Sequence, residues 1–237
     1  MGTVTNHSDS ATRQHLLHAA LKCFAQRGYA ATSVQEIVDA ARVSKPVLYY
    51  YFSDKANLFQ AVVDKAHDER YRILQAAAAR GRSVAEKLEE IVAGIFQYSL
   101  RNRELMRLTF ATAFGAAGDA PGRARCREKG RRNYEFIKRL IEGGQASGEL
   151  TRAHPADGLA MGIYGQVNSY VMVRLLMPDC PLNRDTARRI VQLFMHGAAR
   201  RAGEARARER RIQVQNGNLK LGGERRMPRA AHAENGN

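Results

Sequence analysis

Residues 19–59 read AALKCFAQRGYAATSVQEIVDAARVSKPVLYYYFSDKANLF, and the signals in this stretch decide the fold class. Around its start, apolar residues recur four positions apart from Leu16 to Phe24. This spacing predicts an amphipathic helix over 12–27. Gly28 follows directly, and glycine is favoured immediately after the end of a helix. The stretch therefore begins with a helix and its stop signal.

A second, shorter helix is predicted after this stop. Ser33 and Glu36 have the spacing of a capping box, in which each side chain accepts a hydrogen bond from the backbone N–H of the other residue. Thr32 with Gln35 offers the same pattern in an alternative register. In either register the helix is expected to run to about Ala41.

A third helix follows a tight turn at 42–43. Ser44 is a favourable N-cap, and Pro46 falls in the first turn, where a missing backbone N–H costs little. The helix is expected to end near Phe52. Two short helices joined by a tight turn and preceded by a supporting helix indicate a helix-turn-helix in a three-helix frame.

The rest of the chain is also predicted to be helical, because amphipathic stretches alternate with Gly- and Pro-containing breaks and no period-two pattern indicates a strand. We therefore predict an all-α protein with an N-terminal three-helix helix-turn-helix domain and a C-terminal helical domain. The further helices are expected at about 55–80, 84–100, 102–116, 123–146, 155–177 and 185–210. The predicted divisions are a flexible N-terminus (1–11), the helix-turn-helix domain (12–54), the C-terminal helical domain (55–211) and a disordered basic tail (212–237).

Composition limits the partners and the compartment. The formal net charge is +15, which favours nucleic acid or another anionic partner. Residues 1–55 carry six basic and four acidic side chains, so only +2 of this charge lies in the helix-turn-helix region. No apolar run is long enough to span a membrane, and the polar start has no signal core. The cysteines Cys23, Cys126 and Cys180 form no Cys-x-x-Cys pair, so we expect reduced thiols, a cytoplasmic protein and no membrane partner.

Signals for catalysis are missing from the sequence. It contains no Gly-x-Ser-x-Gly, no His-Glu-x-x-His, no P-loop and no Gly-x-Gly-x-x-Gly. His15 and His18 lie one helical turn apart, but no pattern of cysteines or carboxylates accompanies them. We therefore expect a protein that is not an enzyme and that uses no metal and no cofactor.

The third helix has an unusual composition for a short surface helix. Leu48 and Phe52 lie four residues apart and are expected to face the supporting helices. This arrangement leaves a lysine and several tyrosines on the other faces. A lysine can bind phosphate or the major-groove edge of guanine, and tyrosine offers a flat ring and a hydroxyl group. The free N–H groups at the helix starts near Ser33 and Ser44 can also hold phosphate oxygens.

Residues 12–59 resemble the DNA-binding domain of the TetR (tetracycline repressor-like) family. The resemblance covers about a fifth of the chain and includes Gly followed by an aromatic residue, Thr before the second helix, Ile-x-x-x-Ala, Val-Ser-x-x-x-Leu-Tyr-x-x-Phe, and Lys three residues later. It implies two copies bound to successive major grooves of near-palindromic double-stranded DNA.

The resemblance also implies roles for individual residues. Phosphate contacts would come from the start of the second helix, base contacts from the start of the third helix, and backbone contacts from its tyrosines and the following lysine. Two departures leave the base code open, since Pro46 stands where Gly or Ala is common and Tyr51 where His is common. The implied DNA-binding residues are Thr32, Ser33, Ser44, Lys45, Pro46, Val47, Tyr49, Tyr50, Tyr51 and Lys55.

In this family the C-terminal region encloses a small-molecule site between helices. Large apolar side chains recur on several of the predicted helices, and each could equally be an ordinary core residue. The candidate pocket residues are Phe96, Met106, Phe110, Phe114, Phe136, Met161 and Tyr164. The sequence does not identify the effector.

Two helices near the C-terminal end of the domain are candidates for self-association. Three glycines lie along one side of the helix at 155–177, where each costs roughly 0.8–1 kcal/mol of helix stability relative to alanine. Close approach of another helix would explain them. In the family the corresponding helices form a four-helix bundle across a homodimer, with packing inside one subunit as the alternative. The candidate interface residues are Gly158, Gly162, Gly165, Ile190, Phe194 and Gly197.

These observations lead to one functional hypothesis and one alternative. The hypothesis is a sequence-specific transcriptional repressor that a small apolar or amphipathic ligand releases from its operator. The alternative is a DNA-binding protein of the same fold that binds constitutively, without an effector.

Overall fold

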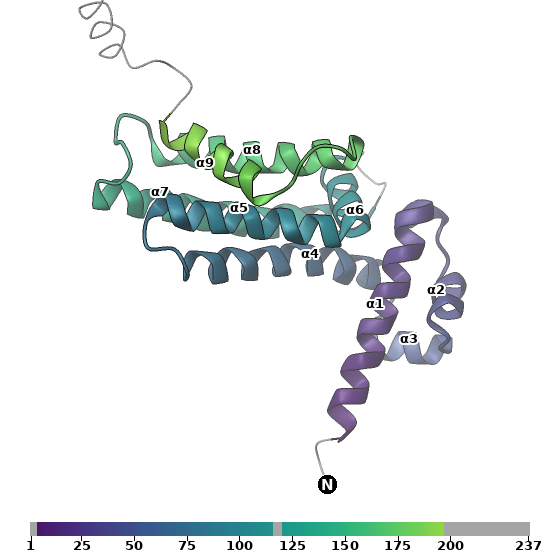
Figure 1. Cartoon of the computed structure of the whole chain (residues 1–237). Helices are drawn as coiled ribbons and strands as arrows, with labels where there is room; N and C mark the ends of the chain where they lie inside the picture. Colours follow the sequence, from purple (N-terminus) through teal and green to yellow (C-terminus); the bar gives the residue numbers. More distant parts are fainter. Residues whose placement is uncertain (1–3, 116–119, 197–237) are drawn as a thin grey trace, which may run out of the picture. The chain divides into compact units, whose positions relative to one another are not determined.

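A computed structural model describes residues 4–115 and 120–196, and this part of the chain contains nine α-helices and no strand (Figure 1). The predicted all-α class is therefore confirmed. The predicted tail at 212–237 and the last residues of the predicted helix at 185–210 lie outside the described residues. The helices are α1 (Val4–Ala31), α2 (Val34–Ala41), α3 (Lys45–Tyr51), α4 (Lys55–Ala78), α5 (Val84–Arg101), α6 (Arg103–Phe114), α7 (Arg123–Ser147), α8 (Ala156–Leu176) and α9 (Arg184–His196).

Helix α1 starts earlier than the sequence indicates. It begins at Val4, so residues 4–11, predicted as part of a flexible N-terminus, are helical. Near its other end the helix is kinked at Gly28, which has φ 77° and ψ 172°. Only glycine adopts this backbone conformation readily, because any Cβ would clash with the main chain. The predicted stop signal at Gly28 thus produces a kink.

Helix α2 has the cap that the sequence predicts. The Ser33 hydroxyl accepts a hydrogen bond from the Glu36 N–H (3.2 Å), and the Glu36 carboxylate accepts one from the Ser33 N–H (2.8 Å). These two bonds form the capping box and start the helix at Val34. The helix ends at Ala41, and Arg42, which caps it with a φ of 51°, makes the tight turn into α3. The capping box therefore selects the Ser33 register.

Helix α3 packs through the two residues predicted for its core. Leu48 is fully buried, and Phe52, at the C-terminal end, is 2% exposed. Pro46 lies in the first turn, where no intrahelical partner for its nitrogen is needed. The side chains of α3 that face away from Leu48 are free to meet a partner.

Helix α4 is shared between the two predicted domains. Its second turn completes the N-terminal core, because the Phe59 ring lies 5.0 Å from that of Phe24 and 5.1 Å from that of Tyr29, both edge-on. Its remaining length packs against α5 and α7, while α8 and α9 cover the opposite side of the C-terminal helices (Figure 1). The predicted boundary after Asp54 therefore precedes a helix that belongs to both cores. Among the helices of the described residues, none has the length and hydropathy needed to cross a bilayer.

Candidate DNA-binding surface and ligand cavity

Helix α3 presents a polar and aromatic surface. Lys45 and Pro46 are exposed, and Tyr49 and Tyr50 remain 49% and 74% exposed. Ser44, just before the helix, is also exposed, and Val47 is half-buried. Large exposed aromatic side chains are unfavourable without a partner. This surface, Ser44 to Tyr50 without the buried Leu48, is the recognition face.

Tyr51 differs from its two neighbours. Its hydroxyl donates a hydrogen bond to the carboxylate of Asp9 in α1, which also raises the pKa of the Tyr51 hydroxyl. Its ring lies edge-on to that of Tyr50, with centroids 4.9 Å apart. The expected contact of Tyr51 with the DNA backbone is therefore corrected: its hydroxyl holds α3 against the N-terminal half of α1.

Thr32 is buried, so the phosphate contact expected for its side chain is wrong. The residue is 1% exposed, and its hydroxyl donates to the Gly28 carbonyl (2.7 Å) and the Cys23 carbonyl (3.3 Å). These bonds tie the residue before α2 to the last turns of α1. Ser33 is exposed, although its hydroxyl is engaged in the cap of α2.

Lys55 is also a structural residue, contrary to the expected contact with the DNA backbone. Its ammonium group donates to the carbonyls of Tyr29 (3.0 Å) and Thr32 (2.9 Å) and lies 4.4 Å from the centroid of the Tyr29 ring. Three favourable contacts hold this charge inside the module. Lys55 therefore links the start of α4 to the connection between α1 and α2.

A cavity of about 390 Å³ lies between α4, α5, α6, α7 and α8. Its volume is within the range of small-molecule sites. Five of the seven candidate pocket residues line it: Met106, Phe110, Phe114, Met161 and Tyr164. Phe114 and Met161 are 73% and 56% exposed, so they lie where the cavity meets the surface.

The other two candidate pocket residues do not line the cavity. Phe96 is 1% exposed, and its ring packs 6.1 Å from that of Tyr170. Phe136 lies edge-on to Tyr71, with ring centroids 5.8 Å apart. Both are ordinary packing residues, because each faces a neighbouring helix instead of the cavity.

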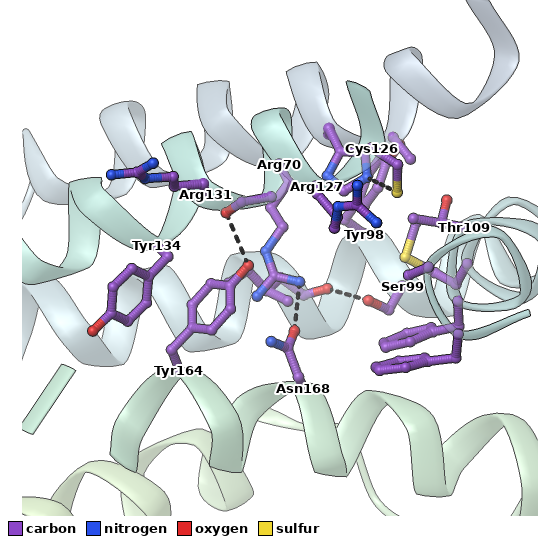
Figure 2. Close-up of a pocket in the computed structure, with 18 of the residues that line it drawn as sticks. Arg70, Tyr98, Ser99, Thr109, Cys126, Arg127, Arg131, Tyr134, Tyr164 and Asn168 are labelled. Atoms are coloured by element: carbon purple, nitrogen blue, oxygen red, sulfur yellow. Dashed lines mark hydrogen bonds between the residues drawn. The ribbon is translucent and has the colours of Figure 1, made fainter. Parts of the chain in front are cut away.

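The polar side of the cavity was not predicted from the sequence. Arg70 of α4 donates through Nη1 to the Asn168 side-chain oxygen (2.8 Å), and its guanidinium lies 5.0 Å from the centroid of the Tyr164 ring. Figure 2 shows the three side chains converging in the cavity. In the sequence Arg70 resembles a surface charge, so only the spatial arrangement identifies it.

Next to the cavity, α4 and α7 are joined by paired charges. Asp68 accepts hydrogen bonds from Lys129 (2.7 Å) and Arg132 (2.8 Å), which lower the pKa of its carboxyl group against the opposing effect of burial. His67, one residue earlier, lies 3.2 Å from the Cys126 sulfur. Burial, assisted by the nearby Arg70, lowers the pKa of His67 to about 4. His67 is therefore neutral at pH 7.

The candidate interface residues have different positions in the single chain. Gly162 and Gly165 have nothing within 4 Å of an added Cβ, so no neighbour within the chain requires glycine there. Gly158 and Gly162 are exposed and Phe194 is half-buried, whereas Gly197 lies outside the described residues. Ile190 is 2% exposed in the core, so its expected interface position is wrong.

The exposed side of α8 is nevertheless apolar. Met172 is 41% exposed and Leu176 is 78% exposed, and both continue the side of the helix that carries Gly162 and Gly165. Leu193 of α9 is 47% exposed. We call these five residues the α8–α9 apolar face.

The helix-turn-helix of α2 and α3, with its exposed recognition face, defines a protein of the helix-turn-helix DNA-binding class. Residues 16–62 match the family described as bacterial regulatory proteins, tetR family. This part of the chain is therefore similar to the DNA-binding domain of the TetR family, and the resemblance seen in the sequence is confirmed.

Individual relatives agree with this assignment. The HTH-type transcriptional activator FasR of Mycolicibacterium smegmatis is 36% identical over 98 residues, which are 41% of this chain and 45% of FasR. The HTH-type transcriptional repressor SCO4008 of Streptomyces coelicolor is 27% identical over 165 residues, 69% of this chain and 80% of that protein. The chain thus spans less than half the length of FasR.

A solved structure extends the likeness to the C-terminal helices. FadR of Bacillus subtilis, in complex with stearoyl-CoA, superposes with a TM-score of 0.68 over 78% of this chain and 99% of that chain, at 16% identity. At this identity the comparison establishes the fold alone.

Proposed function

We propose that the protein is a sequence-specific transcriptional regulator that binds a near-palindromic operator as a homodimer. The recognition face supports DNA binding, because its exposed lysine and tyrosines have the chemistry of phosphate and base contacts. The α8–α9 apolar face supports dimerisation, because its glycines allow close approach and its apolar side chains gain by burial.

We further propose that it is a repressor released from the operator by a small apolar or amphipathic ligand. Helix α4 carries this proposal. Its first residue, Lys55, is bonded to the N-terminal module, while Ala66, His67 and Arg70 of the same helix line the cavity. A ligand that fits one orientation of α4 better than another changes the population of DNA-binding conformers. FadR of Bacillus subtilis, with its bound stearoyl-CoA, is a protein of this fold that holds a small molecule.

Selection of bound sequences from a random DNA pool tests the first proposal. We expect enriched sequences with two half-sites related by a dyad and centred about 10 base pairs apart or a multiple of that spacing. Fluorescence anisotropy with the selected DNA then tests the second proposal. A cavity ligand should lower the affinity for DNA, whereas unchanged affinity with the cavity filled would support constitutive binding.

A further inference from the structure

The guanidinium of Arg70 has an unused pair of hydrogen-bond donors. Nη1 donates to Asn168, whereas Nε and Nη2 are buried and donate to no atom of the described residues. Nε–H and Nη2–H lie on one edge of the planar group and point the same way. This edge is able to bind both oxygens of a carboxylate in parallel.

Nearby carboxylates do not neutralise Arg70. Within residues 4–115 and 120–196, no ion pair includes Arg70, while Asp64 and Asp68 pair with Lys129 and with other arginines. The described residues that line the cavity include no Asp or Glu, but they include Arg127 and Arg131 as well as Arg70. A buried, unpaired guanidinium is unfavourable, so an anion entering the cavity would supply the missing partner.

The rest of the lining suits a hydrocarbon body. Met106, Phe110 and Met161 line the cavity, and the rings of Phe110 and Phe114 are stacked with centroids 6.1 Å apart. Methionine and phenylalanine adapt to flexible apolar groups without requiring hydrogen bonds. The cavity therefore combines positively charged side chains with an apolar wall.

We propose that the effector is an amphipathic carboxylic acid whose carboxylate binds Nε and Nη2 of Arg70 and whose hydrocarbon body lies against Met106, Phe110 and Met161. The inference deepens the proposed ligand response by naming the chemical class of the ligand. Asn168 is a positioning residue in this site, since its bond to Nη1 holds the guanidinium of Arg70 in the cavity wall (Figure 2).

Calorimetric titration of the full-length chain tests the proposal directly. The probes are straight-chain carboxylates from hexanoate to hexadecanoate, each paired with its methyl ester and with its coenzyme A thioester. We expect at least one free acid to bind about tenfold or more tightly than its ester, because only the acid offers a charged bidentate acceptor. Equal binding of acid and ester, binding of the thioester alone, or no binding of any acid would overturn the proposal.

Three substitutions on α4 locate the binding point. Arg70→Leu should remove the preference for the acid, and Arg70→Lys should keep only part of it because lysine lacks the planar fork. Arg72→Leu is the matched control, since Arg72 is exposed on the same helix and does not line the cavity. The melting temperature of each variant without ligand checks folding. An undiminished preference in folded Arg70→Leu contradicts the proposal.

The same titrations separate this inference from the proposed regulation. If the acid binds through Arg70 while the affinity for selected DNA stays constant, the proposed release from DNA fails and the assignment of the ligand class stands. If another compound releases the DNA and no acid binds, the regulation stands and the assignment of the ligand class fails.

Discussion

The ammonium group of Lys55 donates a 2.9 Å hydrogen bond to the main-chain carbonyl of Thr32, which joins the first residue of α4 to the residue before the Ser33 cap. Through this bond and the one to Tyr29, the position of α2 depends on the start of α4. Lys55, for which the family resemblance implies a contact with the DNA backbone, thus holds the N-terminal module together.

Substitution of Lys55 should therefore affect stability. Lys55→Met removes two hydrogen bonds from a charged donor and should lower the free energy of unfolding by roughly 1.5–3 kcal/mol. The dependence of DNA affinity on salt should keep its slope, since no phosphate contact is lost. Thermal denaturation and anisotropy at several salt concentrations measure both. Lys65→Met, on the exposed side of α4, is the control. If the salt slope falls by about one while the stability is unchanged, the result would show that Lys55 contacts a phosphate group.

The recognition face and the core of α3 should respond differently to truncation. Tyr49→Ala and Lys45→Ala remove exposed side chains and should weaken DNA binding by about 1–3 kcal/mol with little change in melting temperature. Phe52→Ala empties a buried site and should destabilise the module by about 3–5 kcal/mol. Circular dichroism and binding to selected DNA distinguish the two classes. Unfolding by Tyr49→Ala would mean that the orientation of α3 is wrong.

His67 should make stability dependent on pH. Because its pKa is about 4 in the folded chain and 6.5 is the ordinary value, the folded state disfavours the charged imidazole. The contribution of neutral His67 is complete above pH 6.5 and is lost as the pH falls toward 4. The loss reaches about 3 kcal/mol, at 1.36 kcal/mol per pKa unit.

Chemical denaturation between pH 7.5 and about pH 4 measures this loss in the wild type and in His67→Gln. The variant keeps a polar side chain without the titration, so its stability should fall less. Charges that face His67 include Arg70, Asp64, Lys129 and Asp68, and these side chains are present in both proteins. Parallel curves for the two proteins would contradict the assignment.

Substitutions at two glycines test whether Gly162 lies in the dimer interface. Gly162→Leu places a side chain where the single chain has open space, so the fold should persist while close approach at the α8–α9 apolar face is blocked. We expect the mass from light scattering to shift from dimer to monomer. Gly143→Leu on α7 is the matched control, since an added Cβ there also meets nothing within 4 Å. A dimer that persists in Gly162→Leu would place the interface elsewhere.

The sequence was sufficient for α2 and α3, because their signals are local. The Ser33–Glu36 cap, the turn at Arg42 and the spacing of Leu48 and Phe52 depend on neighbours within a few residues. The role of Thr32 could not be predicted in this way, since its burial depends on the path of the chain after the kink in α1.

The residues that line the cavity are even harder to predict from local sequence signals. In the sequence, Phe96 and Phe110 are both apolar residues of an amphipathic helix, and nothing local distinguishes them. The packing of the other helices places Phe96 in the core and Phe110 in the cavity wall. Arg70 and Asn168 are 98 positions apart in the sequence, with no local pattern linking them. Their pairing arises because α4 and α8 both pack against α7.

Helix α4 is long enough for a small rotation near the cavity to move its first residue by several ångströms. Arg70 follows Lys55 by 15 positions, which corresponds to about 22 Å along a helix that rises 1.5 Å per residue. A rotation of about 10° around Arg70 would move Lys55 by roughly 4 Å, slightly more than the 3.4 Å rise between base pairs. A small rotation of α4 beside the ligand therefore moves the start of the helix by about the distance between two base pairs.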